Sequence, residues 1–113
     1  MITKYSKTFL KESKILRKKY PKFDLDLLNF INNLEKESLL NSSKIKELKS
    51  LEIYKSRIRN SSNQLGKSGG FRIIYYIKTN EKTFYLLNIY SKTEKTNIST
   101  KEILQILKSE NLI

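Results

Sequence analysis

Two neighbouring runs of aromatic and β-branched residues constrain the fold of this chain most strongly. The first extends from Phe71 to Ile77 and the second from Thr83 to Tyr90. Residues of this kind favour a pleated, half-buried surface over a helix. The three residues Thr79 to Glu81 between the runs are compatible with a turn. The pattern therefore predicts an antiparallel hairpin at the centre of a sheet.

A third strand is predicted before the hairpin, over Tyr54 to Arg59. Because side chains alternate between the two faces of a strand, Lys55, Arg57 and Arg59 are expected on one face. Arg72 on the neighbouring strand would join them from the side if the two strands pair. The sequence thus predicts a concentrated anion site on a rigid scaffold.

The charge of the chain agrees with this site. The 113 residues include 23 Lys and Arg against 11 Asp and Glu, which gives a net charge of +12. Residues 44–95 hold twelve of the basic and four of the acidic residues, so most of the excess belongs to the predicted sheet. Such an excess indicates a polyanionic partner, although lysine enrichment from an A/T-rich genome would account for part of it.

Arginine discriminates between these two explanations. Three of the four arginines lie in the predicted third strand and the hairpin, at positions 57, 59 and 72. Where composition favours lysine, a retained guanidinium indicates bidentate phosphate contact. The chain has neither cysteine nor histidine, so disulfides, thiolate nucleophiles, the usual zinc sites and imidazole catalysis are excluded. We expect no metal and no cofactor.

Helices are predicted on both sides of this stretch. Residues 2–6 are compatible with a short edge strand, and a helix from about Thr8 is stopped by Pro21. Its basic face fits either contact with an anionic partner such as RNA or simple solvation. Asp24 is the predicted N-cap of a second helix that ends near Lys36. The expected apolar positions of the two helices are Phe9, Ser13, Leu16 and Tyr20 in the first, and Leu27, Leu28, Ile31 and Leu34 in the second.

Two further segments complete the predicted fold. Residues 38–50 are expected to form a connecting loop with one helical turn, seated in the core by Leu39, Leu40, Ile45, Leu48 and Leu51. Ser99 and Glu102 have the spacing of a capping box, which predicts a last helix through about Ser109. The fold class is therefore α+β, in the order β-α-α-β-β-β-α, with a small twisted, mainly antiparallel sheet. A helical hairpin covers one face of that sheet.

The glycine-rich segment Leu65 to Gly70 contains Gly-Lys-Ser but is not a phosphate-binding P-loop. Position 61, where the first glycine of that motif belongs, is a serine, and the segment leads into a strand where a P-loop leads into a helix. We expect a loop in which Gly69 and Gly70 permit positive φ angles. Lys67 is either a contact to nucleic acid or an ordinary loop lysine.

These residues together carry a resemblance to a known family. The segments that carry it are Tyr54–Arg59, Gly66–Tyr76 and Ile89–Glu94. In this order they resemble the HigB branch of the RelE/ParE superfamily of bacterial toxins. The resemblance implies a RelE-like fold and a toxin of a type II toxin–antitoxin system that cleaves messenger RNA in the translating ribosome. It also implies contact with ribosomal RNA and a cognate antitoxin of the helix-turn-helix class.

Chemistry without histidine is feasible for this reaction. The RNA's own 2′-hydroxyl attacks the phosphate, and neighbouring positive charges lower the pKa of a lysine toward that of a useful base. We expect Lys55 to be this base, with Arg57 and Arg72 stabilising the transition state. Arg59 is expected to hold a flanking phosphate. The resemblance suggests that Lys92 approaches either the same phosphate or the leaving oxygen.

The general acid is not assigned by the sequence. RelE-type relatives carry an arginine where this chain has Thr93, and a tyrosine expected near the start of the last helix is missing. Tyr90 and Tyr76 are the alternatives, unless both serve only as core aromatics.

Two other functions stay open. One is a ParE-like inhibitor of DNA gyrase that cleaves nothing, and the other is an RNA-binding module without catalysis. The length predicts one domain over residues 1–113, and the absence of a signal-peptide core predicts a cytoplasmic protein.

Overall fold

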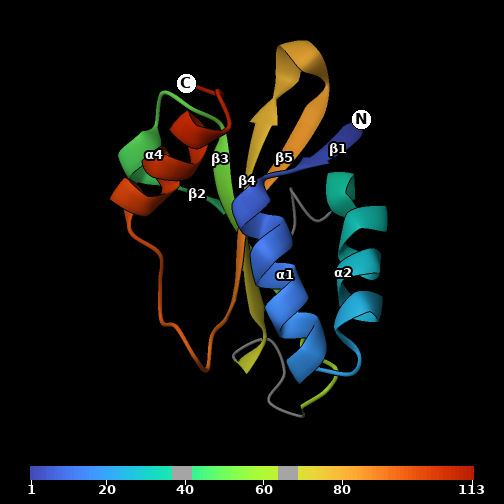
Figure 1. Ribbon diagram of the computed structural model, residues 1–113. Coiled ribbons are helices and arrows are strands. Elements are labelled where there is room, and N and C mark those ends of the chain that lie inside the picture. Colours follow the sequence, from blue (N-terminus) through green and yellow to red (C-terminus); the bar gives the residue numbers. More distant parts are fainter. Residues whose placement is uncertain (37–41, 64–68) are drawn as a thin grey trace.

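A sheet of five strands in the order β1-β5-β4-β3-β2 forms the centre of the molecule (Figure 1). The computed structural model describes residues 1–36, 42–63 and 69–113. The architecture is α+β, as predicted, because helices pack against this mixed sheet. Leu39, Leu40 and Lys67 lie outside the described residues.

The predicted hairpin and third strand are confirmed. β4 (Phe71–Lys78) and β5 (Thr83–Ser91) pair antiparallel, and β3 (Ile53–Ile58) pairs antiparallel with β4. A single turn of 3-10 helix, η3 (Thr79–Glu81), connects the hairpin, and Lys82 closes it with a φ of 49°. The sequence runs that favour strands thus occupy the three central strands of the sheet.

The two edge strands differ from the centre. β1 (Ile2–Tyr5) is the predicted edge strand and runs parallel to β5. β2 (Ser42–Lys44) pairs antiparallel with β3 and was not predicted, since its three polar residues carry no alternation of apolar side chains. It is followed by a 3-10 turn, η1 (Lys46–Leu48), which corresponds to the predicted helical turn.

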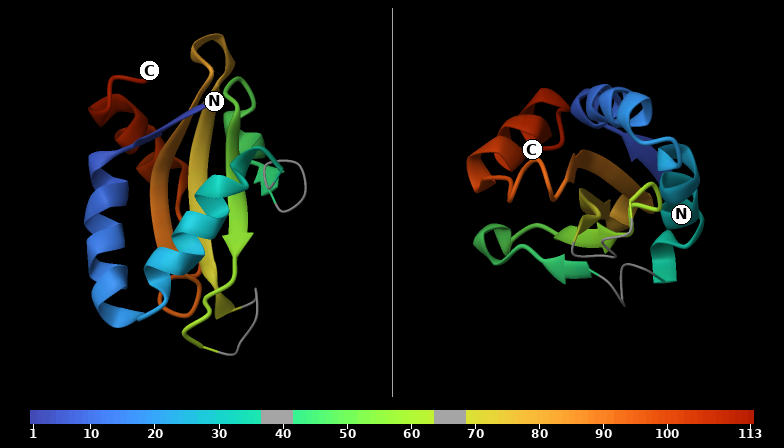
Figure 2. Two further views of the ribbon diagram at one scale, coloured as in Figure 1. Left: turned by 90° about the vertical axis from the view of Figure 1, so that its right-hand side faces the viewer. Right: turned by 90° about the horizontal axis from the view of Figure 1, so that it is seen from below.

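Helices α1, α2 and α4 surround the sheet, and Figure 2 shows their arrangement from two sides. α1 (Lys7–Lys19) has Ser6 as its N-cap and ends at Tyr20, immediately before Pro21 as predicted. α2 (Phe23–Asn32) follows after a short turn. α4 (Thr100–Ser109) begins with the predicted capping box of Ser99 and Glu102. In the described part of the chain, no helix is long and apolar enough to span a bilayer.

Alternate residues of the central strands face two separate apolar cores. On one face, side chains of the sheet pack against α1 and α2, and its largest members include Phe9, Phe23, Phe30, Phe71, Tyr75 and Phe84. On the other face, they pack against α4, with Ile53, Ile74, Tyr76, Leu87, Tyr90, Ile103 and Leu107. We call these the hairpin face, after the α1–α2 hairpin, and the α4 face.

The second helix differs from the prediction in three details, the first of which is that it ends at Asn32 instead of near Lys36. Its N-cap is Lys22, which makes no capping hydrogen bond through its side chain, and Asp24 lies within the first turn. Leu28 is 54% exposed, because the helix turns Phe23, Asp26 and Phe30 toward the sheet instead. The buried aromatic residues therefore fix the rotation of α2, and Leu28 lies outside the core.

Gly70 is required for a different reason from the one predicted. A Cβ atom at this position would lie 2.0 Å from the carbonyl oxygen of Ile58, whereas no positive φ accompanies it. The backbone of β4 therefore approaches the end of β3 more closely than any residue with a side chain would allow. This close approach lies at the edge of the predicted basic site.

Candidate active site

Three of the predicted site residues lie on one face of the sheet. The pleat of β3 directs Ile53, Lys55 and Arg57 toward the α4 face, while Tyr54 and Ile58 pack on the hairpin face. Arg57 pairs directly with Arg72 across the β3–β4 ladder. Arg72 therefore lies beside Arg57, as predicted, and the two guanidinium groups come from adjacent strands.

Arg72 is the most buried cation of this group, with 5% of its surface exposed. Its Nη1 atom donates a hydrogen bond to the carbonyl oxygen of Phe71 at 3.3 Å. Burial lowers the pKa of Arg72, and the positive charge of Arg57 lowers it further. Placing a guanidinium here opposes folding, since both desolvation and like charge disfavour its cationic form.

The surroundings of Lys55 lower its pKa. Partial burial lowers its pKa, and the charges of Lys92, Arg72 and Arg57 act in the same direction, against a smaller opposing effect of Glu47. Its Nζ atom donates a hydrogen bond to Oδ1 of Asn97 at 2.8 Å. A lowered lysine pKa at a site of clustered cations is the property that proton abstraction near neutral pH requires.

An open pocket of about 370 Å³ adjoins Lys55. It lies between the segment around β2 and η1 and the chain that leads into α4. Its lining residues are Ser43, Lys44, Ile45, Lys46, Glu47, Lys55, Asn97, Ile98, Thr100 and Ile103. The pocket gives a ligand access to Lys55 from solvent.

Lys92 follows directly after β5 and is anchored by its backbone. Its amide donates to the carbonyl oxygen of Gly70 at 2.9 Å, and its Nζ donates to the carbonyl oxygen of Thr96 at 2.6 Å. The side chain thus lies along its own loop, yet its charge still affects the pKa of Lys55. The structure therefore brings Lys55, Arg57, Arg72 and Lys92 into one electrostatic group.

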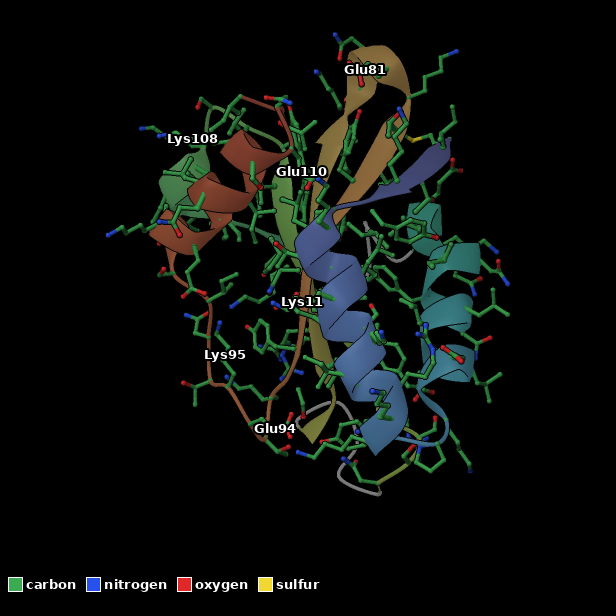
Figure 3. All side chains as sticks on the ribbon, in the orientation of Figure 1. Lys11, Glu81, Glu94, Lys95, Lys108 and Glu110 are labelled. Atoms are coloured by element: carbon green, nitrogen blue, oxygen red, sulfur yellow. The ribbon has the colours of Figure 1, made fainter. Side chains whose placement is uncertain are left out.

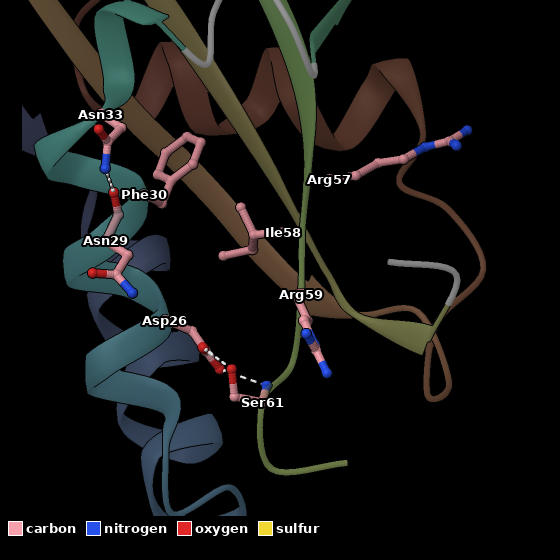
Figure 4. Close-up of a pocket in the computed structure, with 8 residues that line it drawn as sticks. All are labelled: Asp26, Asn29, Phe30, Asn33, Arg57, Ile58, Arg59 and Ser61. Atoms are coloured by element: carbon pink, nitrogen blue, oxygen red, sulfur yellow. Dashed lines mark hydrogen bonds between the residues drawn. The ribbon is translucent and has the colours of Figure 1, made fainter. Parts of the chain in front are cut away.

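Arg59 follows directly after Ile58, the last residue of β3. It is exposed like Arg57, but it is not among the charges that lower the pKa of Lys55. Arg57 and Arg59 both line a pocket of about 270 Å³ beside α2. In Figure 4 the Arg57 side chain points away from α2, whereas Arg59 lies near Ser61, which donates two hydrogen bonds to Asp26.

Tyr90 extends the row of arginines on the α4 face. It pairs with Arg72 across the β4–β5 ladder, and its hydroxyl is buried without a hydrogen-bond partner among the described residues. Burial raises the pKa of this hydroxyl, and the charge of Arg72 opposes the rise. Lys95 lies over the ring, with its Nζ atom 5.9 Å from the centroid.

Tyr76, the other tyrosine considered, is remote from the arginine pair. It pairs with Ile53 at the opposite end of β3, and its ring stacks on Tyr85 with centroids 6.2 Å apart. Its location therefore favours the role of a core aromatic.

Asn97 accepts the hydrogen bond from Lys55 but was not predicted as a site residue, because a single asparagine in a polar loop gives no signal in the sequence.

Metal-ligating residues do not gather in the described ranges: no three of the Asp and Glu side chains there come close enough to hold an ion. The chemical capacity of the site is therefore that of its cations. It offers a lysine whose pKa is lowered and two guanidinium groups aimed at one side of the sheet, an arrangement that suits a phosphodiester.

A comparison with protein families agrees with this geometry. The model for the RelE toxin of the RelE/RelB toxin–antitoxin system matches residues 41–111. The match covers most of the chain, including all three central strands, the cationic group and α4. It implies an antitoxin as the partner protein. The chain belongs to the RelE family and is a toxin of a toxin–antitoxin system.

Proposed function

We propose that this toxin is a ribosome-dependent endoribonuclease of the HigB branch, which inhibits translation by cutting messenger RNA in the translating ribosome. The observation that carries the proposal is the position of Lys55, with its lowered pKa, beside Arg57 and Arg72. A gyrase inhibitor has no need of a phosphate site of this kind. A module that only binds RNA has no need of a lysine with a lowered pKa.

The proposed reaction uses the substrate's own 2′-hydroxyl as the nucleophile. Neutral Lys55 removes the proton from O2′, a bond forms between O2′ and phosphorus, and the bond from phosphorus to O5′ breaks. The products are a 2′,3′-cyclic phosphate and a 5′-hydroxyl end, and a proton is delivered to the leaving O5′. Because the pKa of Lys55 is lowered, its neutral form is more abundant near neutral pH than that of an ordinary lysine.

The two arginines are proposed to stabilise the charge that develops on the phosphorane. A donor aimed at such a charge contributes about 3 to 4 kcal/mol in other enzymes. Lys92 is proposed to act at the same phosphate, through its charge and its position beside Gly70. Arg59 and Lys67 are proposed as contacts to flanking phosphates, outside the reacting group.

The proposed partners follow from the same reaction. The substrate is messenger RNA on the ribosome, ribosomal RNA supplies the docking surface, and the antitoxin is proposed to be of the helix-turn-helix class. The separation of charge in the chain supports a polyanionic substrate, since residues 44–95 hold most of the net +12.

The test maps the ends of a defined messenger after incubation with the purified toxin, with and without translating ribosomes. Arg72→Lys is the informative variant, because it keeps the charge and removes the planar fork of donors. We expect cuts at codons in the ribosomal A site and a loss of about 10²-fold or more in the variant. Arg17→Lys is the matched control, since Arg17 is ion-paired with Asp24 on the far helices at 2.6 Å.

The other outcomes separate the remaining functions. A messenger left intact with and without ribosomes would overturn the nuclease assignment and direct the next assay to gyrase supercoiling. Cleavage of naked RNA would contradict the dependence on the ribosome. Retained RNA binding without cuts would identify a binding module.

A further inference from the structure

Glu12 is a half-buried carboxyl group that the proposed reaction does not use. It lies on α1 and faces β5, where its two oxygens accept two hydrogen bonds. Asn88 donates through Nδ2 at 2.6 Å and Ile89 donates through its backbone amide at 3.0 Å. These two contacts join α1 to the part of β5 that leads into the cationic site.

The backbone of β5 is irregular at this point. The β4–β5 register shifts between Ile74 and Tyr75: Ile74 pairs with Asn88, whereas Tyr75 pairs with Leu86. Leu87 therefore has no partner on β4 and forms a bulge. On the other side of β5, the pairing with β1 ends at Leu86. Beyond this residue no described strand satisfies the outer edge of β5.

Side chains of α1 and its cap replace the missing strand. The Ser6 hydroxyl, which also caps α1, donates to the carbonyl oxygen of Leu87 at 2.6 Å. Glu12 accepts the next available amide, that of Ile89. Bulges often redirect side chains beside functional sites, and this one is held from outside by two polar residues of another element.

The segment fixed in this way carries site residues. Tyr90 comes immediately after Ile89 and pairs with Arg72, and Lys92 follows two residues later with its amide bonded to Gly70. A shift of β5 by one residue would turn Tyr90 to the opposite face. The alignment of the site therefore depends on the register of β5 beyond the bulge.

We propose that Glu12 is a positioning residue, which holds the distal half of β5 in register with Arg72 by accepting two hydrogen bonds that only a carboxylate accepts together. The proposal rests on the nuclease function proposed above. A protonated carboxyl group, or an amide, presents a donor at one of the two positions. Asn88 then keeps a bond to Glu12 only by turning its Oδ1 atom, which has no partner among the described residues, toward that donor. Glu12 would touch neither the substrate nor the reacting atoms.

The surroundings of Glu12 make its two hydrogen bonds to Asn88 and Ile89 sensitive to pH. Burial raises its pKa to about 7, the bond from Ile89 and the charge of Lys95 oppose the rise, and Glu102 adds to it. Glu94 and Lys95, on the loop beside α1 in Figure 3, line one adjoining pocket of about 140 Å³. Glu102 lines a second pocket of about 320 Å³ toward α4, so protons reach Glu12 from either side.

The test compares Glu12→Gln with the wild-type toxin from pH 6 to 8.5, in single-turnover cleavage of ribosome-bound messenger. We expect similar rates near pH 6, where the wild type is protonated, and a wild-type advantage of about tenfold at pH 8. The midpoint of the change should lie near 7. Glu110→Gln is the control, as Glu110 accepts only the Lys7 amide at the start of α1 among the described groups.

Two results in this assay would overturn the proposal. Equal rates for Glu12→Gln and wild type at every pH would show that the two bonds do not matter to the site. A ratio that stays constant across the pH range would indicate a purely structural role.

A second measurement is independent of nuclease activity. Amide chemical shifts of Ile89, Tyr90 and Lys92 in the isolated toxin should titrate together near pH 7, and this titration should vanish in Glu12→Gln. Flat shifts at Tyr90 and Lys92 in the wild type would reject the positioning role, even if the toxin were found to cut no RNA. Amide chemical shifts that titrate in a toxin without cleavage activity would support the positioning role of Glu12 and reject the proposed reaction.

Discussion

The two faces of the sheet are built from alternate residues of the same strands but contain different groups. On the hairpin face, Phe71 is fully buried, with its ring 5.4 Å from Tyr20 and 5.3 Å from Phe23 in edge-to-face contacts. On the α4 face, the next residue, Arg72, is almost equally buried but brings a positive charge beside Arg57. Adjacent positions of one strand therefore place an aromatic ring in one core and a positive charge on the opposite face.

The α4 face also changes along the strands. Toward η3, Ile53, Ile74 and Tyr76 form an apolar core with α4, whereas Arg57 and Arg72 lie at the opposite end. A cation that is buried beside a second cation is disfavoured both by desolvation and by like charge. The comparison shows where the fold accepts an energetic cost, and this is the place at which we propose that RNA reacts.

Arg72→Met should have the largest effect, because we expect it to reduce cleavage strongly while changing stability little. We expect the single-turnover cleavage rate to fall by about 10² to 10³-fold, because a donor to the developing charge is lost. The free energy of unfolding, measured by urea denaturation, should change far less than in a Phe71 variant, since the buried charge is removed along with its contacts. Wild-type cleavage by this variant would contradict the assignment of Arg72.

Phe71→Ala should have the opposite effect. Removing a fully buried aromatic residue is expected to lower the free energy of unfolding by about 3 to 5 kcal/mol. The rate of cleavage per folded molecule should remain near that of wild type in a stabilising buffer, as the ring faces away from the cations. A loss below about 1 kcal/mol would show that the hairpin face is less tightly packed than the contacts indicate.

Gly70→Ala tests the junction between the faces. The added methyl group would meet the carbonyl oxygen of Ile58 at 2.0 Å, so β3 and β4 must separate at this point. We expect a loss of about 2 kcal/mol in unfolding free energy and a lower cleavage rate, because the Lys92 amide bonds the Gly70 carbonyl. A variant as stable and active as wild type would exclude the close approach.

Glu12 gives the smallest expected effect, on stability against pH. The pKa of Glu12 is about 7 in the folded protein against an ordinary 4.5, so the folded state retains a proton that the unfolded chain releases. Stability should therefore fall as pH rises from about 4.5 to 7, by about 1 kcal/mol after allowing for solvent screening. Denaturation of Glu12→Gln should lack this component, and an identical pH profile would contradict it.

The sequence was sufficient for the elements with strong local signals. The hairpin strands, the end of α1 before Pro21 and the capping box of Ser99 and Glu102 are all confirmed. Prediction failed where tertiary packing decides the outcome. Leu28 is exposed because Phe30 and its aromatic neighbours set the rotation of α2.

The site was predictable where it depends on a local pattern or on the pairing of neighbouring strands. The placement of Lys55 and Arg57 follows from the alternation of β3, and that of Arg72 from simple pairing. The predicted strand extends one residue further than β3, to Arg59, because the end of a strand is poorly marked in sequence. The sequence named Tyr90 as an alternative acid but not Glu12, because the contacts of Glu12 depend on the irregular register of β5.

The most direct test of the account is the activity of Lys55→Arg. This variant keeps a cation at the site, but a guanidinium does not release its proton at any pH used for cleavage. We expect wild-type toxin to leave 2′,3′-cyclic phosphate and 5′-hydroxyl ends on ribosome-bound messenger. We expect Lys55→Arg to bind ribosomes normally but to cut about 10² to 10⁴-fold more slowly. Cleavage by Lys55→Arg at the wild-type rate would contradict the role of Lys55 as the base.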